Sequence, residues 1–268
     1  MTAAVSVIVR AKDEAASIGR TLDLIAAQRV DGDVEVIVVD SGSTDGTPDI
    51  ARERGARLIE IPAASFTFGG ALNTGCEIAT APVCVALSAH AFPLDDGWLA
   101  RMLAAMAGER VCAANGQEYD VRGGTMTAPR DQDAELAASN WTWGYSNAAG
   151  AFRRDLWEQH RFRADMPGTE DKEWAWHWLR QGWVVRVDPA LNVDHSHAKD
   201  PLPDIYERAR REWRGYAMFL DLEPYGPRDL VREWWTDRAS WRSHARARLS
   251  HRRAARLLGK YAGRRGAT

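Results

Sequence analysis

Short apolar runs alternate with amphipathic segments through the first half of the chain. The apolar runs are rich in Val and Ile, which is typical of buried strands, and lie at residues 5–10, 34–40, 57–62 and 83–88. The segments that read as helices lie at 12–28, 47–55, 70–80 and 95–107. Strands that alternate with helices predict an α/β fold with a Rossmann-like, mainly parallel sheet and helices on both faces.

The second half is less regular. It contains a strand-like run at 111–120, a strand turning into a helix at 146–160, helices at 168–182 and 201–220, and a strand at 183–189. Basic helices follow over about 228–265, after the Pro- and Gly-containing linker 222–227. We therefore expect a main domain over 1–221, with halves at about 1–110 and 111–221, and a C-terminal helical extension over 222–268.

Composition places the chain among globular proteins, since 45% of its 268 residues are hydrophobic and 27% are charged. No apolar run approaches the roughly 20 residues that span a bilayer. The N-terminus lacks the layout of a signal peptide. The three cysteines form no CxxC pair, which predicts reduced thiols and a cytoplasmic location.

Charge is distributed unevenly along the chain. Residues 228–268 hold 12 Lys and Arg against 3 Asp and Glu, whereas the whole chain has a net charge of −2. A basic tail with tryptophans favours contact with phosphates or with the inner face of a membrane, although a solvated helical cap would have the same composition. Nucleic acid is a poorer candidate partner, because no recognition module precedes the tail.

The stretch IVVDSGSTDGT places a carboxylate and a turn of small residues at the end of a predicted buried strand. A carboxylate in that place can bind a base or ribose, and the turn lets backbone N–H groups approach phosphates. The bland alternative is a strand–turn–helix corner with capping residues. Ligands of such sheets bind beyond the carboxyl ends of the strands, where this turn and the later SAH segment would meet.

Several blocks in this order resemble a family 2 glycosyltransferase, and most of all its non-processive, rhamnosyltransferase-like members. The blocks are VSVIVRAKDEAASIGRTLD, VIVVDSGSTDGT, FGGALNTGCEIATAP, LSAHAFPLDDGWL and GTEDKEWAWHWLRQG. The resemblance implies the GT-A fold and inverting transfer of one sugar from a nucleoside-diphosphate sugar to a hydroxyl acceptor. It also implies a divalent metal, Mn²⁺ or Mg²⁺.

The same resemblance implies a set of nucleotide-binding residues. They are Arg10, Lys12, Glu14, Asp40, Ser43, Asp45, Gly69, Gly70, Asn73, Ser88 and Ala89. Helix entry or packing is the alternative role for the glycines.

The SAH segment departs from the acid–x–acid motif that holds the family's metal. Ser88 and His90 stand where two carboxylates are expected, and an imidazole suits Mn²⁺ better than Mg²⁺. His195 and His197 in DHSH are further candidate ligands, and one of them could instead orient the other. Either histidine binds the metal, or Arg and His side chains neutralise the diphosphate in its place.

Glu170 and Asp171 match the family's acidic pair at a helix start. The resemblance assigns Asp171 as the general base that deprotonates the acceptor hydroxyl, with Glu170 as its neighbour or an acceptor contact. Acids at a helix N-terminus can also merely complement the helix dipole.

Aromatic residues are candidates for an acceptor platform, namely Trp141, Trp143 and Trp174, and core packing is the alternative for each. Together these features favour an enzyme acting in glycan biosynthesis, with an acceptor that can be lipid-linked. The alternative is a catalytically degenerate GT-A domain that binds a glycan or a partner protein.

Overall fold

The computed structural model describes residues 3–195, 200–236 and 250–265. Their contacts divide the chain into two compact units. The first comprises 1–164 and 171–195, and the second comprises 165–170 and 196–268. In the described helices, no segment is long and apolar enough to cross a membrane.

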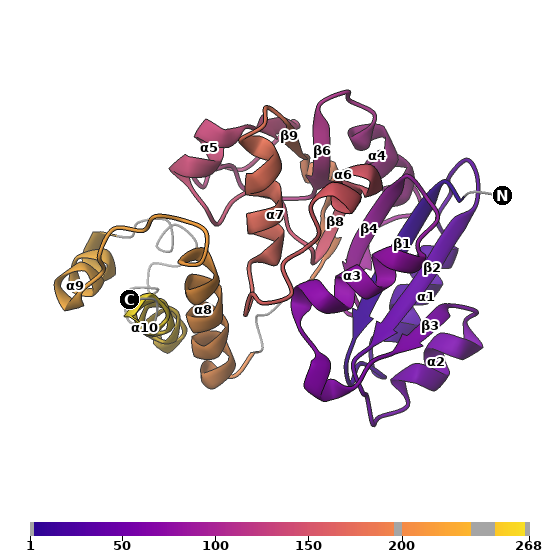
Figure 1. The fold of residues 1–268 in the computed structure, drawn as a ribbon, viewed down its shortest axis with the longest axis horizontal. Helices are drawn as coiled ribbons and strands as arrows, with labels where there is room; N and C mark the ends of the chain where they lie inside the picture. Colours follow the sequence, from indigo (N-terminus) through magenta and orange to yellow (C-terminus); the bar gives the residue numbers. More distant parts are fainter. Residues whose placement is uncertain (1–2, 196–199, 237–249, 266–268) are drawn as a thin grey trace. The chain divides into compact units, whose positions relative to one another are not determined.

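The first unit is built on a sheet with the strand order β3-β2-β1-β4-β8-β6-β9-β7 (Figure 1). Its parallel half contains β1 (Val5–Ala11), β2 (Val34–Asp40), β3 (Arg57–Glu60) and β4 (Val83–Ser88). The chain runs outward from β1 to β3 and then returns to place β4 on the other side of β1. The ends of β1 and β4 therefore form a topological switch point, where open α/β sheets bind ligands.

Antiparallel pairing completes the sheet. The remaining strands are β6 (Val111–Asn115), β7 (Arg130–Gln132), β8 (Ala149–Arg153) and β9 (Val184–Val187). Strand β8 lies antiparallel between β4 and β6, β7 is antiparallel to β9, and β6 and β9 are parallel. The predicted α/β fold with a mainly parallel sheet is thus confirmed, and the antiparallel insertion of β8 is what the sequence pattern did not reveal.

Helices cover both faces of the sheet. They are α1 (Ile18–Ala26), α2 (Thr47–Glu53), α3 (Phe68–Ile78), α4 (Trp98–Met106), α5 (Ala134–Ser139), α6 (Arg154–Gln159) and α7 (Glu170–Leu179). Side chains alternate across β1, so that Val7 and Val9 pack in the cluster that contains Trp98, while Ile8 packs in the one that contains Leu72 and Trp174. A strand with both faces buried explains the continuous apolar run.

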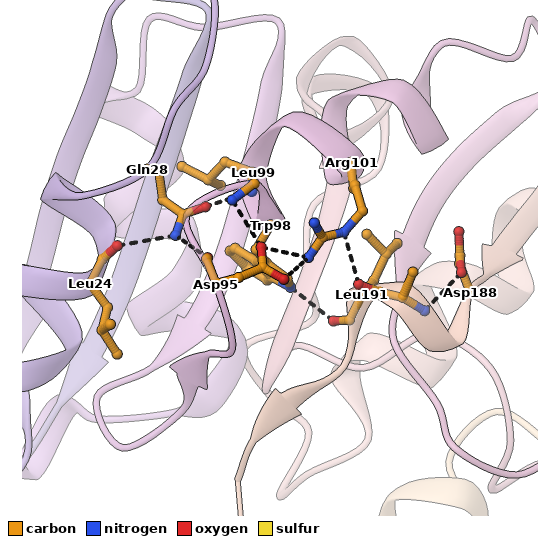
Figure 2. Close-up of polar contacts among 10 residues, drawn as sticks. Leu24, Gln28, Asp95, Trp98, Leu99, Arg101, Asp188 and Leu191 are labelled. Atoms are coloured by element: carbon orange, nitrogen blue, oxygen red, sulfur yellow. Dashed lines mark hydrogen bonds and ion pairs between the residues drawn. The ribbon is translucent and has the colours of Figure 1, made fainter.

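A two-stranded ribbon joins distant parts of this unit. Strand β5 (Phe92–Pro93) pairs antiparallel with β10 (Val193–Asp194), so that Asp194 lies opposite Phe92. Just before β10, the 3₁₀ turn Pro189–Leu191 is held by α4 (Figure 2). Trp98 Nε1 donates to the Leu191 carbonyl at 2.8 Å, and Arg101 Nε donates to the Ala190 carbonyl at 3.1 Å.

Asp95 and Gln28 fix the start of α4 in the same network (Figure 2). Both carboxylate oxygens of Asp95 accept from Arg101 at 2.9 Å, and one also accepts from the Gly97 N–H at 2.9 Å. Gln28 accepts from the Leu99 N–H and donates to the Asp95 carbonyl, which ties α1 to α4. These bonds make Asp95 a structural residue of the turn before α4.

The second unit is helical. It contains α8 (Leu202–Tyr216), α9 (Pro227–Thr236) and α10 (His251–Arg265). Gly259 and Gly263 bring α10 against α8, since a Cβ on either would lie 2.3 Å from the carbonyl oxygen of Tyr206 or Arg210. Helix α8 therefore groups with the C-terminal helices, whereas the boundary expected from sequence falls after residue 221.

Candidate active site

The loop between β1 and α1 is joined to the turn after β2 by hydrogen bonds. The Asp13 N–H donates to Ser43 Oγ, and Asp13 Oδ1 accepts from the Thr44 N–H, each at 2.8 Å. Asp45 Oδ2 accepts from the Ala15 N–H at 2.9 Å. The sequence predicted one helix over 12–28, but these bonds, with Asp13 at a φ of 52°, keep the first residues in a loop.

The carboxylate of Asp40 stabilises the turn that follows β2. It is 1% exposed, and its Oδ2 accepts from the N–H groups of Gly42 and Ser43 at 3.0 and 2.9 Å. Its Oδ1 accepts from Ser43 Oγ. Asp45 similarly accepts from Thr47 Oγ1 at 2.6 Å, and this bond first of all lowers the pKa of Asp45. These bonds account for Asp40, Ser43 and Asp45 as turn-forming residues, and their predicted role in nucleotide binding stays a prediction.

Glu14, His90 and His195 form a cluster at the end of β4. Glu14 Oε1 lies 2.7 Å from His90 Nδ1, and Glu14 Oε2 accepts from Ser17 Oγ at 2.6 Å. The rings of His90 and His195 stack at 4.9 Å with an interplanar angle of 22°. Burial raises the pKa of Glu14, but the hydrogen bonds from His90 and Ser17 outweigh it, so the pKa is lowered and the carboxylate stays ionised.

Among the described residues, this cluster offers one carboxylate and two imidazoles in place of the acid–x–acid pair. Ser88 and Ala89 supply no carboxylate, and both oxygens of Glu14 are engaged by neighbouring side chains. Over residues 3–195, 200–236 and 250–265, no group of three or more His, Cys, Asp or Glu side chains could hold a metal ion. His197, the third expected ligand, lies outside the described residues.

Gly69, Gly70 and Asn73 have packing roles in α3. A Cβ on Gly69 would lie 2.5 Å from the Arg163 carbonyl oxygen, and one on Gly70 would lie 2.6 Å from Thr67 Oγ1, the N-cap of the helix. The Asn73 amide donates to the Phe162 carbonyl and accepts from Trp157 Nε1, both at 2.8 Å. The expectation of a ligand contact gains no support here, because protein atoms already fill these positions.

Asp171 lies at the same edge of the sheet as the end of β1. Its Oδ2 accepts from the Asn147 N–H at 3.2 Å, and its Oδ1 accepts from the Lys172 N–H at 2.8 Å. Arg10, in β1, donates to the Asn147 carbonyl at 3.3 Å and to the Phe68 carbonyl at 3.1 Å. Because Ala11 pairs with Asp40, a continuous set of contacts joins the predicted base to the turn after β2.

Tyr145 lies near Asp171 in space, and Glu170 precedes it in the sequence. Tyr145 is fully buried, and burial first, then the charge of Asp171, raises its pKa well above the usual value. Glu170 is 4% exposed and belongs to the second unit, whereas Asp171 belongs to the first. Sequence reasoning did not single out Asn147, since a backbone N–H leaves no side-chain signal.

Two of the three expected acceptor tryptophans are buried in the core, which favours the packing alternative for them. Trp174 is fully buried and donates to the His160 carbonyl at 2.7 Å. Trp143 is 5% exposed and donates to the Tyr119 carbonyl at 2.9 Å. Trp141 is partly buried and packs edge-on against Trp176 at 4.8 Å, so it alone of the three keeps an accessible surface.

Solved structures with a similar fold include two complexes that contain Mn²⁺ with a nucleotide or a nucleotide sugar. A mannosyltransferase from Pyrobaculum calidifontis, in complex with GDP-Man and Mn²⁺, is 23% identical with a TM-score of 0.65, over 95% of this chain and 74% of that one. Glucosyl-3-phosphoglycerate synthase from Mycobacterium tuberculosis, in complex with Mn²⁺ and UDP, is 20% identical with a TM-score of 0.64, over 84% and 82%. At these identities the similarity shows the GT-A fold alone.

The comparison with curated proteins finds no match for this chain. The family model described as "Glycosyl transferase family 2" matches residues 6–183, from β1 to the residue before β9. That match spans more than half of the 268 residues and includes the loop of Glu14, the turn of Asp40, the segment of His90 and Asp171. The chain therefore belongs to glycosyl transferase family 2.

Proposed function

We propose that the protein is an inverting glycosyltransferase that moves a single hexosyl or deoxyhexosyl group from a nucleoside-diphosphate sugar to a hydroxyl acceptor. The observation that supports it most is the carboxylate of Asp171, oriented by two backbone N–H groups at 2.8 and 3.2 Å beside the ends of β1 and β8. A carboxylate held by two backbone N–H groups has a restricted position, which is what a general base needs.

The chemistry needs one base and one leaving group. Asp171 takes the proton of the acceptor hydroxyl as its oxygen bonds to the anomeric carbon. The bond from that carbon to the diphosphate breaks on the opposite side, and its electron pair leaves with the nucleoside diphosphate. Attack opposite to the leaving group inverts the anomeric configuration.

The test compares two acidic residues of α7. Wild type and the variants Asp171→Asn and Glu173→Gln are incubated with a panel of UDP, GDP, dTDP and CDP sugars, and nucleoside diphosphate released by transfer to water is measured. We expect Asp171→Asn to lose roughly 10²–10⁴-fold in rate, the range for a general base. Glu173, whose carboxylate lies 3.2 Å from His160 Nε2, is the control and should keep wild-type rates.

The same assay distinguishes this enzyme from the binding-module alternative, which the loss of the acid–x–acid motif favours. A degenerate domain would bind a nucleotide sugar without turnover. Wild type, Asp171→Asn and Glu173→Gln would then all release nucleoside diphosphate at the uncatalysed rate. Turnover in wild type that survives Asp171→Asn would instead mean that another group is the base.

We further propose that the acceptor is lipid-linked in glycan biosynthesis and that α9 contacts an anionic membrane surface at the cytoplasmic face. One face of α9 docks on α10, since Glu233 accepts from Lys260 Nζ at 2.7 and 2.9 Å. On the other face, Val231 and Trp235 are 57% and 60% exposed, one turn apart. Exposed apolar anchors beside arginines such as Arg232 fit a surface of anionic lipid.

Vesicle sedimentation tests this contact. We expect the protein to bind vesicles containing phosphatidylglycerol more than pure phosphatidylcholine, and added salt to weaken the binding. The double variant Val231→Ser/Trp235→Ser should bind less, whereas the control Leu202→Ser, which changes a 43% exposed leucine on α8, should bind as wild type. Equal binding by both variants would refute the assignment to α9.

A further inference from the structure

Arg10 joins three segments of the first unit that are distant in the sequence. It lies near the end of β1, the strand that pairs with β2 on one side and with β4 on the other. Its side chain contacts the Phe68 carbonyl at the start of α3 and the Asn147 carbonyl just ahead of β8. We propose, on the basis of the function proposed above, that Arg10 is a positioning residue for the base Asp171 and acts on it through Asn147.

The main chain of Asn147 is the link between the arginine and the base. Its carbonyl accepts from Arg10 Nη2 at 3.3 Å, and its N–H donates to Asp171 Oδ2 at 3.2 Å. Asn147 is 1% exposed, so bulk water has little access to this link. Because both groups belong to one residue, a donor that fixes the carbonyl also restricts the direction of the N–H.

The fold directs the Arg10 side chain toward this link. Side chains alternate across a strand, so Arg10 projects from the same face of β1 as Ile8, which packs in the cluster that includes residues of α3 and α7. The guanidinium carbon of Arg10 lies 5.6 Å from the centre of the Phe68 ring, and Nη1 donates to the Phe68 carbonyl at 3.1 Å. A planar guanidinium with these two contacts has a restricted orientation, from which Nη2 meets Asn147.

The segment that leads to β8 is held by further donors. Gln117 donates to the Gly144 carbonyl at 2.8 Å, and Lys172 Nζ donates to the Trp143 carbonyl at 3.3 Å. Of these donors, the arginine of β1 is the one that contacts the residue whose N–H binds the base. Its removal should therefore displace the base more directly than removal of the others.

The titration of Tyr145 independently places the two charged groups near each other. Burial first, then the charge of Asp171, raises the pKa of Tyr145, whereas the charge of Arg10 lowers it. Both charges thus lie within electrostatic reach of one fully buried phenol. This proximity agrees with the link through Asn147.

Kinetics and binding together distinguish this role from the nucleotide contact that the family resemblance implies for Arg10. Arg10→Met keeps an apolar stem without donors, and Arg10→Lys keeps the charge. The control is Arg57→Met, which removes an arginine of β3 that donates to the carbonyl of Ile78, at the other end of α3, at 3.2 Å. Affinities for UDP, GDP, dTDP and CDP are measured by calorimetry, and kcat is measured with the nucleotide sugar that the panel identifies.

We expect Arg10→Met to lower kcat by about 10- to 100-fold, since a small misplacement of a reacting group has effects of this size. Its nucleotide affinity should stay as in wild type, because a positioning residue does not touch the donor. Arg10→Lys should have an intermediate kcat, and Arg57→Met should match wild type in both measurements.

A double-mutant cycle with the base gives a readout that a merely structural role would not produce. Asp171→Asn already lacks the base, so adding Arg10→Met to it should lower the rate no further. Independent roles would multiply instead, and a multiplied loss would overturn the inference.

A measurement on Asn147 itself does not depend on turnover. The protein is prepared with ¹⁵N-labelled asparagine, and the amide resonance of Asn147 is assigned by its absence from Asn147→Gln. The carboxylate of Asp171 makes this a charge-assisted hydrogen bond, which moves the amide proton downfield. We expect Arg10→Met to shift the proton upfield, toward its position in Asp171→Asn, and Arg57→Met to leave it unchanged.

The outcomes separate this inference from the proposed function. An Asn147 resonance at its wild-type position in a folded Arg10→Met protein would overturn the inference, even if Asp171-dependent transfer is observed. A loss of nucleotide affinity that accounts for the whole loss of rate would overturn it as well. A displaced resonance would support it even if no nucleotide sugar is turned over, a result that contradicts the proposed function alone. Circular dichroism checks the fold, and Arg10→Lys serves for the same measurements if Arg10→Met does not fold.

Discussion

His177 shows at the scale of one residue how packing changes a titration. Its ring stacks on His160 with centroids 3.7 Å apart and an interplanar angle of 5°. Burial first, and then the charge of His160, lowers the pKa of His177 from its ordinary value of 6.5, with Arg180 acting in the same direction and Glu173 opposing. The folded protein thus binds this proton less readily than the unfolded chain.

The sign of the pH dependence follows from that lowered pKa. A histidine whose pKa is lower in the folded state contributes full stability above pH 6.5, and this contribution falls as the pH drops below that value. We expect the melting temperature of wild type to fall more steeply below pH 6.5 than that of His177→Gln, measured by calorimetry. Parallel curves for the two proteins would contradict this prediction.

Helix α4 and the turn it holds illustrate the scale of an element. Trp98 is fully buried, and its Nε1 satisfies the Leu191 carbonyl ahead of β10. A phenylalanine in its place would fill most of the space but leave that carbonyl without its donor. A buried polar group that loses its partner costs about 1–3 kcal/mol.

We therefore expect Trp98→Phe to lower the free energy of unfolding by about 1–3 kcal/mol in urea denaturation. Trp235→Phe, at a 60% exposed position of α9, is the control and should be neutral. A neutral Trp98→Phe would mean that water replaces the lost donor.

At the scale of the whole molecule, the two units differ in how they are held together. The first depends on a sheet with a core on each face, whereas the second depends on close helix contact at Gly259 and Gly263. A larger side chain at either glycine must separate α10 from α8, because the nearest atoms are backbone carbonyl oxygens.

We expect Gly259→Leu to accelerate amide hydrogen exchange in α8 and α10 while exchange in β1 and β4 stays as in wild type. Mass spectrometry of peptides from the four elements measures this. Leu258→Ala, which changes a neighbouring side chain that is 49% exposed, is the matched control and should leave both sets unchanged. Slow exchange in α8 and α10 of Gly259→Leu would show that the close contact is dispensable.

The sequence by itself determined the parallel half of the sheet, since strands that are buried over most of their length, such as 5–11 and 34–40, are rich in apolar residues that the local pattern reveals. The order of the motifs along the chain also predicted the family and indicated Asp171 as the candidate base. Only the tertiary structure decided that Trp143 and Trp174 are core residues, that Asn73 joins α3 to Phe162, and that His90 meets Glu14 and His195. Burial and these pairings depend on contacts between residues that are distant in the chain, which neither periodicity nor spacing can specify.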